Sequence, residues 1–118
     1  MLAEDSIKTY VQTLGGVTIL LASGAVDMAT APQFRAAIAD ILADHPAAFV
    51  IDLLGVEFFG SAGVSVLVDT RDGVASDVRF AVVAAGPVTG RVLQLLNLEE
   101  LLSVHENLDA ALTAINAT

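Results

Sequence analysis

The chain has 118 residues, of which 55% are apolar and 16% are charged, and its formal net charge is −9. A chain of this length builds one domain with its own hydrophobic core. With 14 acidic residues against 5 basic ones, the composition argues against direct binding of nucleic acid, which needs clustered Lys and Arg. The absence of cysteine excludes disulfides, thiol catalysis and thiolate metal sites.

The N-terminal segment differs from a secretory signal peptide, because Glu4 and Asp5 stand where such a peptide carries positive charge. The longest uncharged run, residues 9–26, contains three glycines and a glutamine, so it predicts two strands and a turn rather than a membrane helix. We therefore expect a cytosolic protein that inserts no segment into a membrane.

Residues 7–26 contain two apolar, β-branched runs separated by Gly15 and Gly16. Two consecutive glycines suit a tight hairpin turn, since both accept a positive φ angle. We predict two antiparallel strands joined at this glycine pair.

A helix is predicted between Thr30 and Pro46. Thr30 and Gln33 have the spacing of a capping box, and Pro32 falls in the first turn, where its missing N–H costs nothing. Pro46 ends the pattern. The apolar residues that share one face of this helix are Phe34, Ile38, Ile41 and Leu42.

Strands and helices then alternate to the end of the chain. Residues 47–53 form an apolar run typical of a strand covered on both faces, and a loop is predicted at 55–60. The remaining predicted elements are, in chain order, a helix at 61–73 with Gly73 as its C-terminal cap, a strand at 78–83, a helix from Gly86 through Leu96, a strand at 101–104 and a helix capped by Asn107.

The order β-β-α-β-α-β-α-β-α predicts a single α/β domain over residues 1–118. We expect a mixed β-sheet that opens with an antiparallel hairpin and carries about four packed helices. Two of the helices have predicted inward faces, which comprise Val88, Val92, Leu95 and Leu96 in one helix and Leu108, Leu112 and Ile115 in the other.

The uncharged segment FFGSAGVSVLV, residues 58–68, contains two serines, Ser61 and Ser65. A phosphate-binding loop of the GxxxxGK[ST] type is excluded because no Lys follows Gly63. The glycines of this region also lack the GxGxxG spacing of a dinucleotide site. We therefore predict no nucleotide or other cofactor at this segment.

Catalysis by Ser61 would need a neighbouring base, and the chain has only two histidines, His45 and His105. Neither is part of a motif that links it to a serine and an aspartate. The sequence also lacks HExxH or paired-histidine spacing. We therefore predict no metal site and no enzymatic activity, with a small hydrolase that uses Ser61 as an alternative.

Ser61 precedes an apolar helical run, so its hydroxyl can cap the free N–H groups of the first turn. The same position also suits phosphorylation, because the helix dipole favours an anion there by about 0.3–1 kcal/mol. Phosphate would add negative charge and block a partner that packs flat on the segment. Both interpretations of Ser61 remain open on the sequence.

Three segments resemble the STAS domain family, in the branch of the anti-sigma factor antagonists. They are VIDLLGVEFFGSAGVSVL (50–67), GAVDMATAPQFR (24–35) and GPVTGRVLQLLNLEELLSVHENLDAAL (86–112). Together they span nearly the whole chain in the element order predicted above. The resemblance implies a single STAS domain over residues 1–118.

The resemblance also implies a partner switch without a cofactor. The unmodified antagonist binds an anti-sigma factor, usually a serine kinase of the histidine-kinase-like ATP-binding fold, and thereby releases a sigma factor for transcription. Phosphorylation by that kinase breaks the complex, and a phosphatase resets it.

The chain departs from the family motif at the site of phosphorylation. The usual acceptor position is Ala62, the motif's aspartate is Gly60, and Ser61 matches the first serine of the motif. Three alternatives follow: Ser61 has become the acceptor, Ser65 has, or the protein binds its partner constitutively. Ser65 is expected to be less exposed than Ser61. We favour constitutive binding, since alanine locks the unmodified state.

The resemblance further implies a partner-binding surface made of the segment after the second strand and the start of the following motif helix. Asp27 and Thr30 can also serve as helix caps, and the two roles are compatible. The predicted contact residues are Gly24, Asp27, Thr30, Phe59, Gly60, Ser61, Ala62, Gly63 and Val64.

An alternative function from another class is that of a STAS subunit in a membrane transporter complex for lipids or solutes. The sequence contains no feature that separates this alternative from the antagonist. It also leaves the oligomeric state open.

Overall fold

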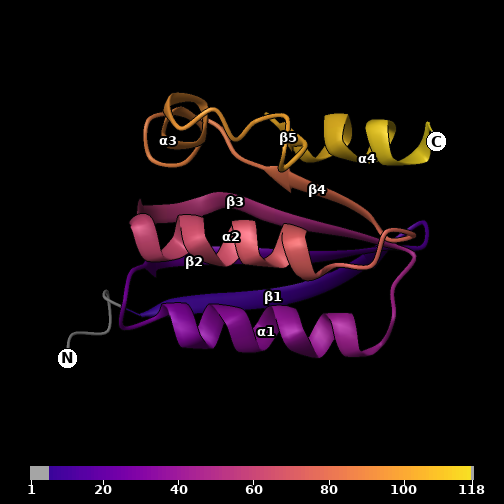
Figure 1. The fold of residues 1–118 in the computed structure, drawn as a ribbon, viewed down its shortest axis with the longest axis horizontal. Coiled ribbons are helices and arrows are strands. Elements are labelled where there is room, and N and C mark those ends of the chain that lie inside the picture. Colours follow the sequence, from indigo (N-terminus) through magenta and orange to yellow (C-terminus); the bar gives the residue numbers. More distant parts are fainter. Residues whose placement is uncertain (1–5, 118) are drawn as a thin grey trace.

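The computed structural model describes residues 6–117, which form one mixed sheet with helices packed on it (Figure 1). Within that range the chain has five strands and four helices, in the predicted order. Their bounds are β1 Ile7–Leu14, β2 Val17–Val26, α1 Ala31–Ala43, β3 Ala48–Phe59, α2 Ser61–Gly73, β4 Arg79–Val83, α3 Gly90–Leu95, β5 Val104–His105 and α4 Leu108–Asn116.

The strands lie in the sheet in the order β1-β2-β3-β4-β5, with β1 and β2 antiparallel and every other pair parallel. Leu14 pairs with Val17 across the turn, in which Gly15 and Gly16 have φ angles of 54° and 81°. Both angles suit a two-residue hairpin turn that matches the twist of the strands. The predicted hairpin and mixed sheet are confirmed.

The sheet is covered on both faces, which explains the unbroken apolar run of β3. Because side chains alternate along a strand, Phe49 and Ile51 enter the core beneath α1 and α2, whereas Val50 faces α4. The residues beneath α1 and α2 also include Leu93 of α3, and the smaller cluster beneath α4 includes Ile115. Both cores lie within the described residues.

The predicted faces of α1 and α4 are confirmed. In α1, Phe34, Ile38 and Ile41 are buried and Leu42 packs against the same core. At the start of α4, the side chain of Asn107 accepts a 2.8 Å hydrogen bond from the Ala110 N–H, as expected of the predicted cap. The α4 residues that face the sheet are Leu108, Ala111, Leu112 and Ile115.

The loop predicted at 55–60 is wrong, because β3 continues to Phe59. Pairing with the ten-residue β2 keeps this segment extended as far as the pair Val26 and Phe59. Two register shifts in that pairing absorb the irregular part around Gly55, where a Cβ atom would lie 3.0 Å from the Ser23 Cβ. The glycine thus marks a close approach of two strands rather than a loop.

The predicted helix from Gly86 begins later, at Gly90, after a turn closed by a 2.9 Å hydrogen bond from the Arg91 N–H to the Gly86 carbonyl. The buried face of this helix also differs from the prediction. Leu93 is fully buried, whereas Leu95 and Leu96, which were expected inside, are 66% and 52% exposed. The other two residues of the predicted face, Val88 and Val92, are half-buried.

Two further element ends differ from the prediction. The strand expected at 101–104 is a turn as far as Ser103, because the N–H groups of Leu102 and Ser103 bond back to carbonyls of residues 98 and 100. Gly73 is the last residue of α2, and the residue that caps the helix is Val74.

The observed burial in α3 predicts different effects of two leucine-to-alanine substitutions. Leu93→Ala removes a fully buried side chain and is expected to lower the free energy of unfolding by about 2–5 kcal/mol. Leu95→Ala in the same helix changes it by less than about 0.5 kcal/mol. Urea unfolding followed by circular dichroism measures both, and equal losses would contradict the assignment of the buried face.

Candidate partner-binding surface

The carboxyl ends of β2 and β3 lie side by side at one end of the sheet (Figure 1). Val26 pairs with Phe59, and the Gly60 N–H donates a 2.9 Å hydrogen bond to the Val26 carbonyl. The segment after β2 and the start of α2 are therefore neighbours in space. We call residues 27–30 and 60–64 together the strand-end surface.

Asp27 and Thr30 form a hydrogen-bonded turn that leads from β2 into α1. The Asp27 Oδ1 accepts hydrogen bonds from the N–H groups of Ala29 and Thr30, at 2.9 and 3.0 Å. The Thr30 hydroxyl donates to the Ala25 carbonyl at 2.8 Å and accepts from the Asp27 N–H at 3.0 Å. Thr30 is only 4% exposed, so it supports the turn from inside, whereas Asp27 is partly exposed.

The predicted capping box at the start of α1 is wrong. Thr30 is the N-cap residue, but its side chain makes no capping hydrogen bond because it is turned back toward β2. Gln33 instead donates from its Nε2 to the Ile7 carbonyl of β1 at 3.3 Å. The side-chain acceptor before this helix is instead Asp27, whose Oδ1 accepts from the N–H groups of Ala29 and Thr30.

Ser61 is the first residue of α2 rather than its cap. The N-cap is Gly60, whose backbone is extended, with φ −91° and ψ −178°. The Ser61 side chain is exposed, and among residues 6–117 its hydroxyl has no hydrogen-bond partner. Ser65 is also exposed, whereas Ala62 is half-buried against the core.

Gly63 lets α2 pack closely on the ends of β2 and β3. A Cβ atom on Gly63 would lie 2.6 Å from Cε1 of Phe59 and 2.9 Å from Cγ1 of Val26. Both Gly63 and Phe59 are buried, so these two predicted contact residues shape the surface from below. Val64, next in the helix, is half-buried against the core.

Gly24 lies two residues before the end of β2, and its role is also local. It has a φ angle of +90°, and a Cβ atom there would collide with the Ser6 carbonyl oxygen. The same carbonyl accepts a 3.3 Å hydrogen bond from the Ala25 N–H. Gly24 thus permits the chain at Ser6 to pass close to β2.

Two large exposed apolar side chains at this end of the sheet are not among the predicted contact residues. Met28, in the turn after Asp27, is 85% exposed, and Phe58, at the end of β3, is 55% exposed. The Phe58 ring lies beside Gly60, since a Cβ atom there would be 3.3 Å from its Cε2. The sequence indicates their exposure only weakly, because each is an apolar residue that stands close to turn-forming residues or glycine.

The part of the chain that the structure describes contains no group of three or more His, Asp or Glu side chains arranged to hold a metal ion. Among the same residues, no helix has the length and apolar character needed to cross a membrane.

Comparison with known proteins identifies the family. The model of the STAS domain family matches residues 8–111. The chain belongs to the STAS domain family. It is 40% identical over 115 residues to the anti-sigma-F factor antagonist RsfB of Mycobacterium tuberculosis, a match that covers 98% of this chain and 94% of the relative.

Solved structures agree with this assignment. The crystal structure of an anti-sigma factor antagonist from Mycobacterium paratuberculosis superposes with a TM-score of 0.93 at 42% identity, and the match covers 98% of this chain and 99% of the other. The unphosphorylated antagonist SpoIIAA, at 13% identity and a TM-score of 0.72, shares the fold over 94% of this chain and 98% of its own. The STAS fold expected from the sequence is confirmed.

The close packing at Gly63 predicts opposite effects of one substitution at two positions of α2. Gly63→Ala forces a methyl group against the Phe59 ring and is expected to destabilise the protein by about 1–3 kcal/mol. Gly73→Ala meets nothing within 4 Å and is expected to stabilise it by up to about 1 kcal/mol. Thermal unfolding checks the signs, and a stabilising Gly63→Ala would show that α2 is not held against the strand ends.

Proposed function

We propose that this protein is an anti-sigma factor antagonist that binds an anti-sigma factor, releases a sigma factor and so regulates transcription. The observation that carries the proposal is the 40% identity to RsfB, named an anti-sigma-F factor antagonist, over 98% of this chain. Its activity in this proposal is binding in the cytosol, without catalysis. The partner is an anti-sigma factor with a kinase-like ATP-binding fold, as the family resemblance implies.

The geometry of the strand-end surface supports this role. Met28 on this surface and Phe58 just before its second segment present exposed apolar area, and the small residues Gly60, Ser61 and Ala62 permit close approach of a partner backbone. Protein interfaces gain most of their binding free energy from a few such apolar anchors. The net charge of −9 favours a partner with a basic contact face.

We further propose that Ala62 keeps the antagonist in its binding-competent state. The usual acceptor position has no hydroxyl, and the Ala62 side chain is half-buried against the core. Ser61 and Ser65 are both exposed, so each is accessible to a kinase. Phosphate on Ser61, reset by a phosphatase, is the alternative regulation, since the N-terminus of α2 tolerates an anion.

Affinity purification from the native host under stress and non-stress growth tests the proposed function. Wild-type protein is expected to retain an anti-sigma factor without phosphate in both conditions, as identified by mass spectrometry. Met28→Asp is expected to lower its recovery at least about tenfold, because a charge replaces an apolar anchor. Val11→Asp on β1, where Val11 is 52% exposed, serves as the matched control and keeps the partner.

Other outcomes of this purification would contradict the proposal in distinct ways. A permease or transport ATPase in place of the anti-sigma factor would assign the chain to a transporter complex. Phosphate on Ser61 or Ser65 that appears only when the partner is lost would replace constitutive binding by a switch at that serine.

Asp27 allows its turn-forming role to be separated from a contact role. Asp27→Asn keeps the side-chain oxygen that accepts from Ala29 and Thr30, so the free energy of unfolding is expected to change by less than about 1 kcal/mol. The substitution removes the charge, and the affinity for the purified anti-sigma factor is expected to fall at least about fivefold. Asp40→Asn on the exposed face of α1 is the control for net charge. Isothermal titration calorimetry measures the affinities. Equal affinities for the two variants would show that Asp27 only stabilises the turn and makes no contact with the partner.

A further inference from the structure

One edge of the sheet is only half covered. β5 pairs with β4 at Val82 and Val83 alone, whereas β3 pairs with β4 along its whole length from Arg79. The chain turns at Ser103, which has a φ angle of +52°, and only then runs beside β4. The first three residues of β4, 79–81, therefore have a strand neighbour on one side only.

The backbone of Phe80 faces this open side. The N–H groups of Val82 and Ala84 donate toward β5, to the carbonyls of Ser103 and His105 at 3.1 and 3.0 Å. Since the direction of backbone groups alternates along a strand, Phe80 directs its N–H and C=O to the same edge, ahead of the point where β5 begins. Its side chain is buried and its ring packs against Phe49, with ring centroids 5.9 Å apart. The position is thus rigid and presents one donor and one acceptor.

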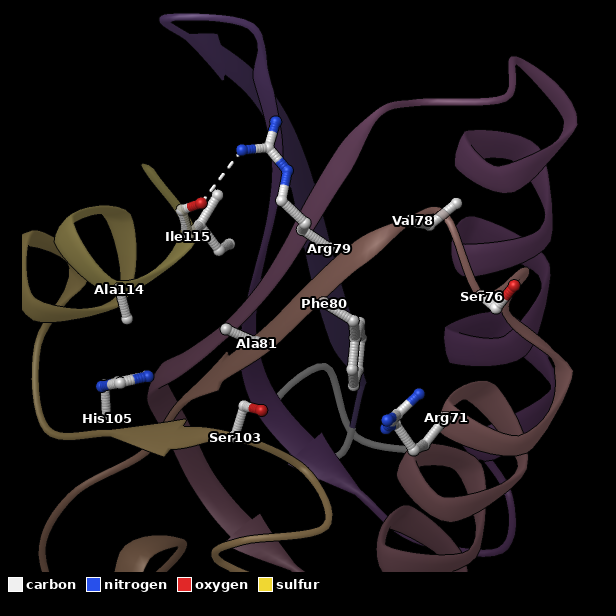
Figure 2. Close-up of a pocket in the computed structure, with 10 residues that line it drawn as sticks. All are labelled: Arg71, Ser76, Val78, Arg79, Phe80, Ala81, Ser103, His105, Ala114 and Ile115. Atoms are coloured by element: carbon white, nitrogen blue, oxygen red, sulfur yellow. Dashed lines mark hydrogen bonds between the residues drawn. The ribbon is translucent and has the colours of Figure 1, made fainter. Parts of the chain in front are cut away.

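A hollow of about 380 Å³ lies along this edge (Figure 2). Its lining includes Phe80 and Ala81 of β4, Ser103 before β5, and two arginines, Arg71 of α2 and Arg79 of β4. In Figure 2, the two arginines lie on opposite sides of Phe80. The hollow thus combines an open strand edge with two cationic side chains.

Both arginines are anchored by main-chain carbonyls, and neither has a carboxylate partner among residues 6–117. The Arg71 Nε donates to the Leu101 carbonyl, and the Arg79 Nη1 donates to the Ile115 carbonyl, each at 3.0 Å. The ion pair found among residues 6–117 joins Arg35 to Asp69 instead. In a chain with 14 acidic and 5 basic residues, two oriented guanidinium groups that flank one hollow without carboxylates are an unusual concentration of positive charge.

We propose that the open edge of β4 between Arg71 and Arg79 binds an extended acidic peptide segment of a partner protein, which adds a strand to the sheet. The N–H and C=O of Phe80 would pair with the backbone of the added strand, as in other cases of strand addition. Successive side chains of a strand point to opposite faces, so two adjacent acidic residues would reach one arginine each.

This binding site is separate from the strand-end surface. Residue 79 is at the amino end of β4, whereas the strand-end surface lies at the carboxyl ends of β2 and β3, and β3 runs parallel to both β2 and β4. The proposal therefore does not rest on the proposed function, and both partners can bind at the same time.

A synthetic peptide tests the proposal on the full chain. The probe is a fluorescein-labelled hexapeptide, Val-Asp-Glu-Val-Val-Val, and its control carries Asn-Gln in place of Asp-Glu. Fluorescence anisotropy is expected to give at least about tenfold weaker binding for the control, with the acidic probe weakening as salt is raised. In ¹⁵N-resolved spectra, the Phe80 amide is expected to shift and its hydrogen exchange to slow on binding, because it gains a partner.

Charge-neutralising variants separate the two arginines from the overall charge. Arg71→Gln and Arg79→Gln are each expected to weaken binding of the acidic probe at least about fivefold. Arg91 is an exposed arginine outside this hollow. Arg91→Gln changes the net charge equally and is expected to leave the affinity for the acidic probe within about twofold of the wild-type value.

Four results would overturn the proposal. Equal binding of the two peptides, or an equal effect of Arg91→Gln, would remove the specific role of the two arginines. A Phe80 amide that stays unchanged while the acidic probe binds would exclude strand addition. Complete displacement of the probe by an equimolar amount of inorganic phosphate would identify a simple anion site. The amide and peptide measurements use wild-type protein, so they stand even where a variant fails to fold.

Discussion

The pairing of β2 with β3 up to their last residues is the constraint on which the strand-end surface depends. Val26 and Phe59 are partners in the sheet, and the hydrogen bond from Gly60 to Val26 directs the chain straight from β3 into α2. No connecting loop intervenes, so the helix start cannot move independently of the strands. It can occupy this place only because residue 63 has no side chain.

This constraint divides the residues of the family-like segments into two kinds. Thr30, Phe59 and Gly63 are buried and fix the shape of the surface, whereas Met28 and Ser61 are exposed on it. Substitution of a buried residue alters partner binding by changing the shape or stability of the fold. Substitution of an exposed residue alters the contact with the partner directly. A measured loss of partner binding can therefore be assigned to contact only when stability is measured beside it.

Most of the architecture was predictable, because the spacing of apolar residues in the sequence indicates which face of a strand or helix is buried. The alternation in β3 and the helical spacing in α1 both reflect faces that are covered in the structure. Local sequence patterns mislead where they compete with strand pairing or with the rotation of a helix on the core. Gly55 is typical of a loop although it lies at a tight strand contact, and Leu95 has the apolar spacing of a buried residue although it lies exposed at the end of α3. Met28 and Phe58 were missed because apolar residues are expected in the core, and only the tertiary structure shows that they lie exposed at the ends of strands.

The order of the strands in the sheet is the same as their order in the chain. Each new strand therefore adds beside the one that precedes it, and no strand must be inserted between two that are already paired. A nascent chain can extend the sheet in one direction during synthesis, with the β1–β2 hairpin as its first, local pairing. The last strand to arrive, β5, has only two residues. The sheet thus grows toward the edge that it leaves half open.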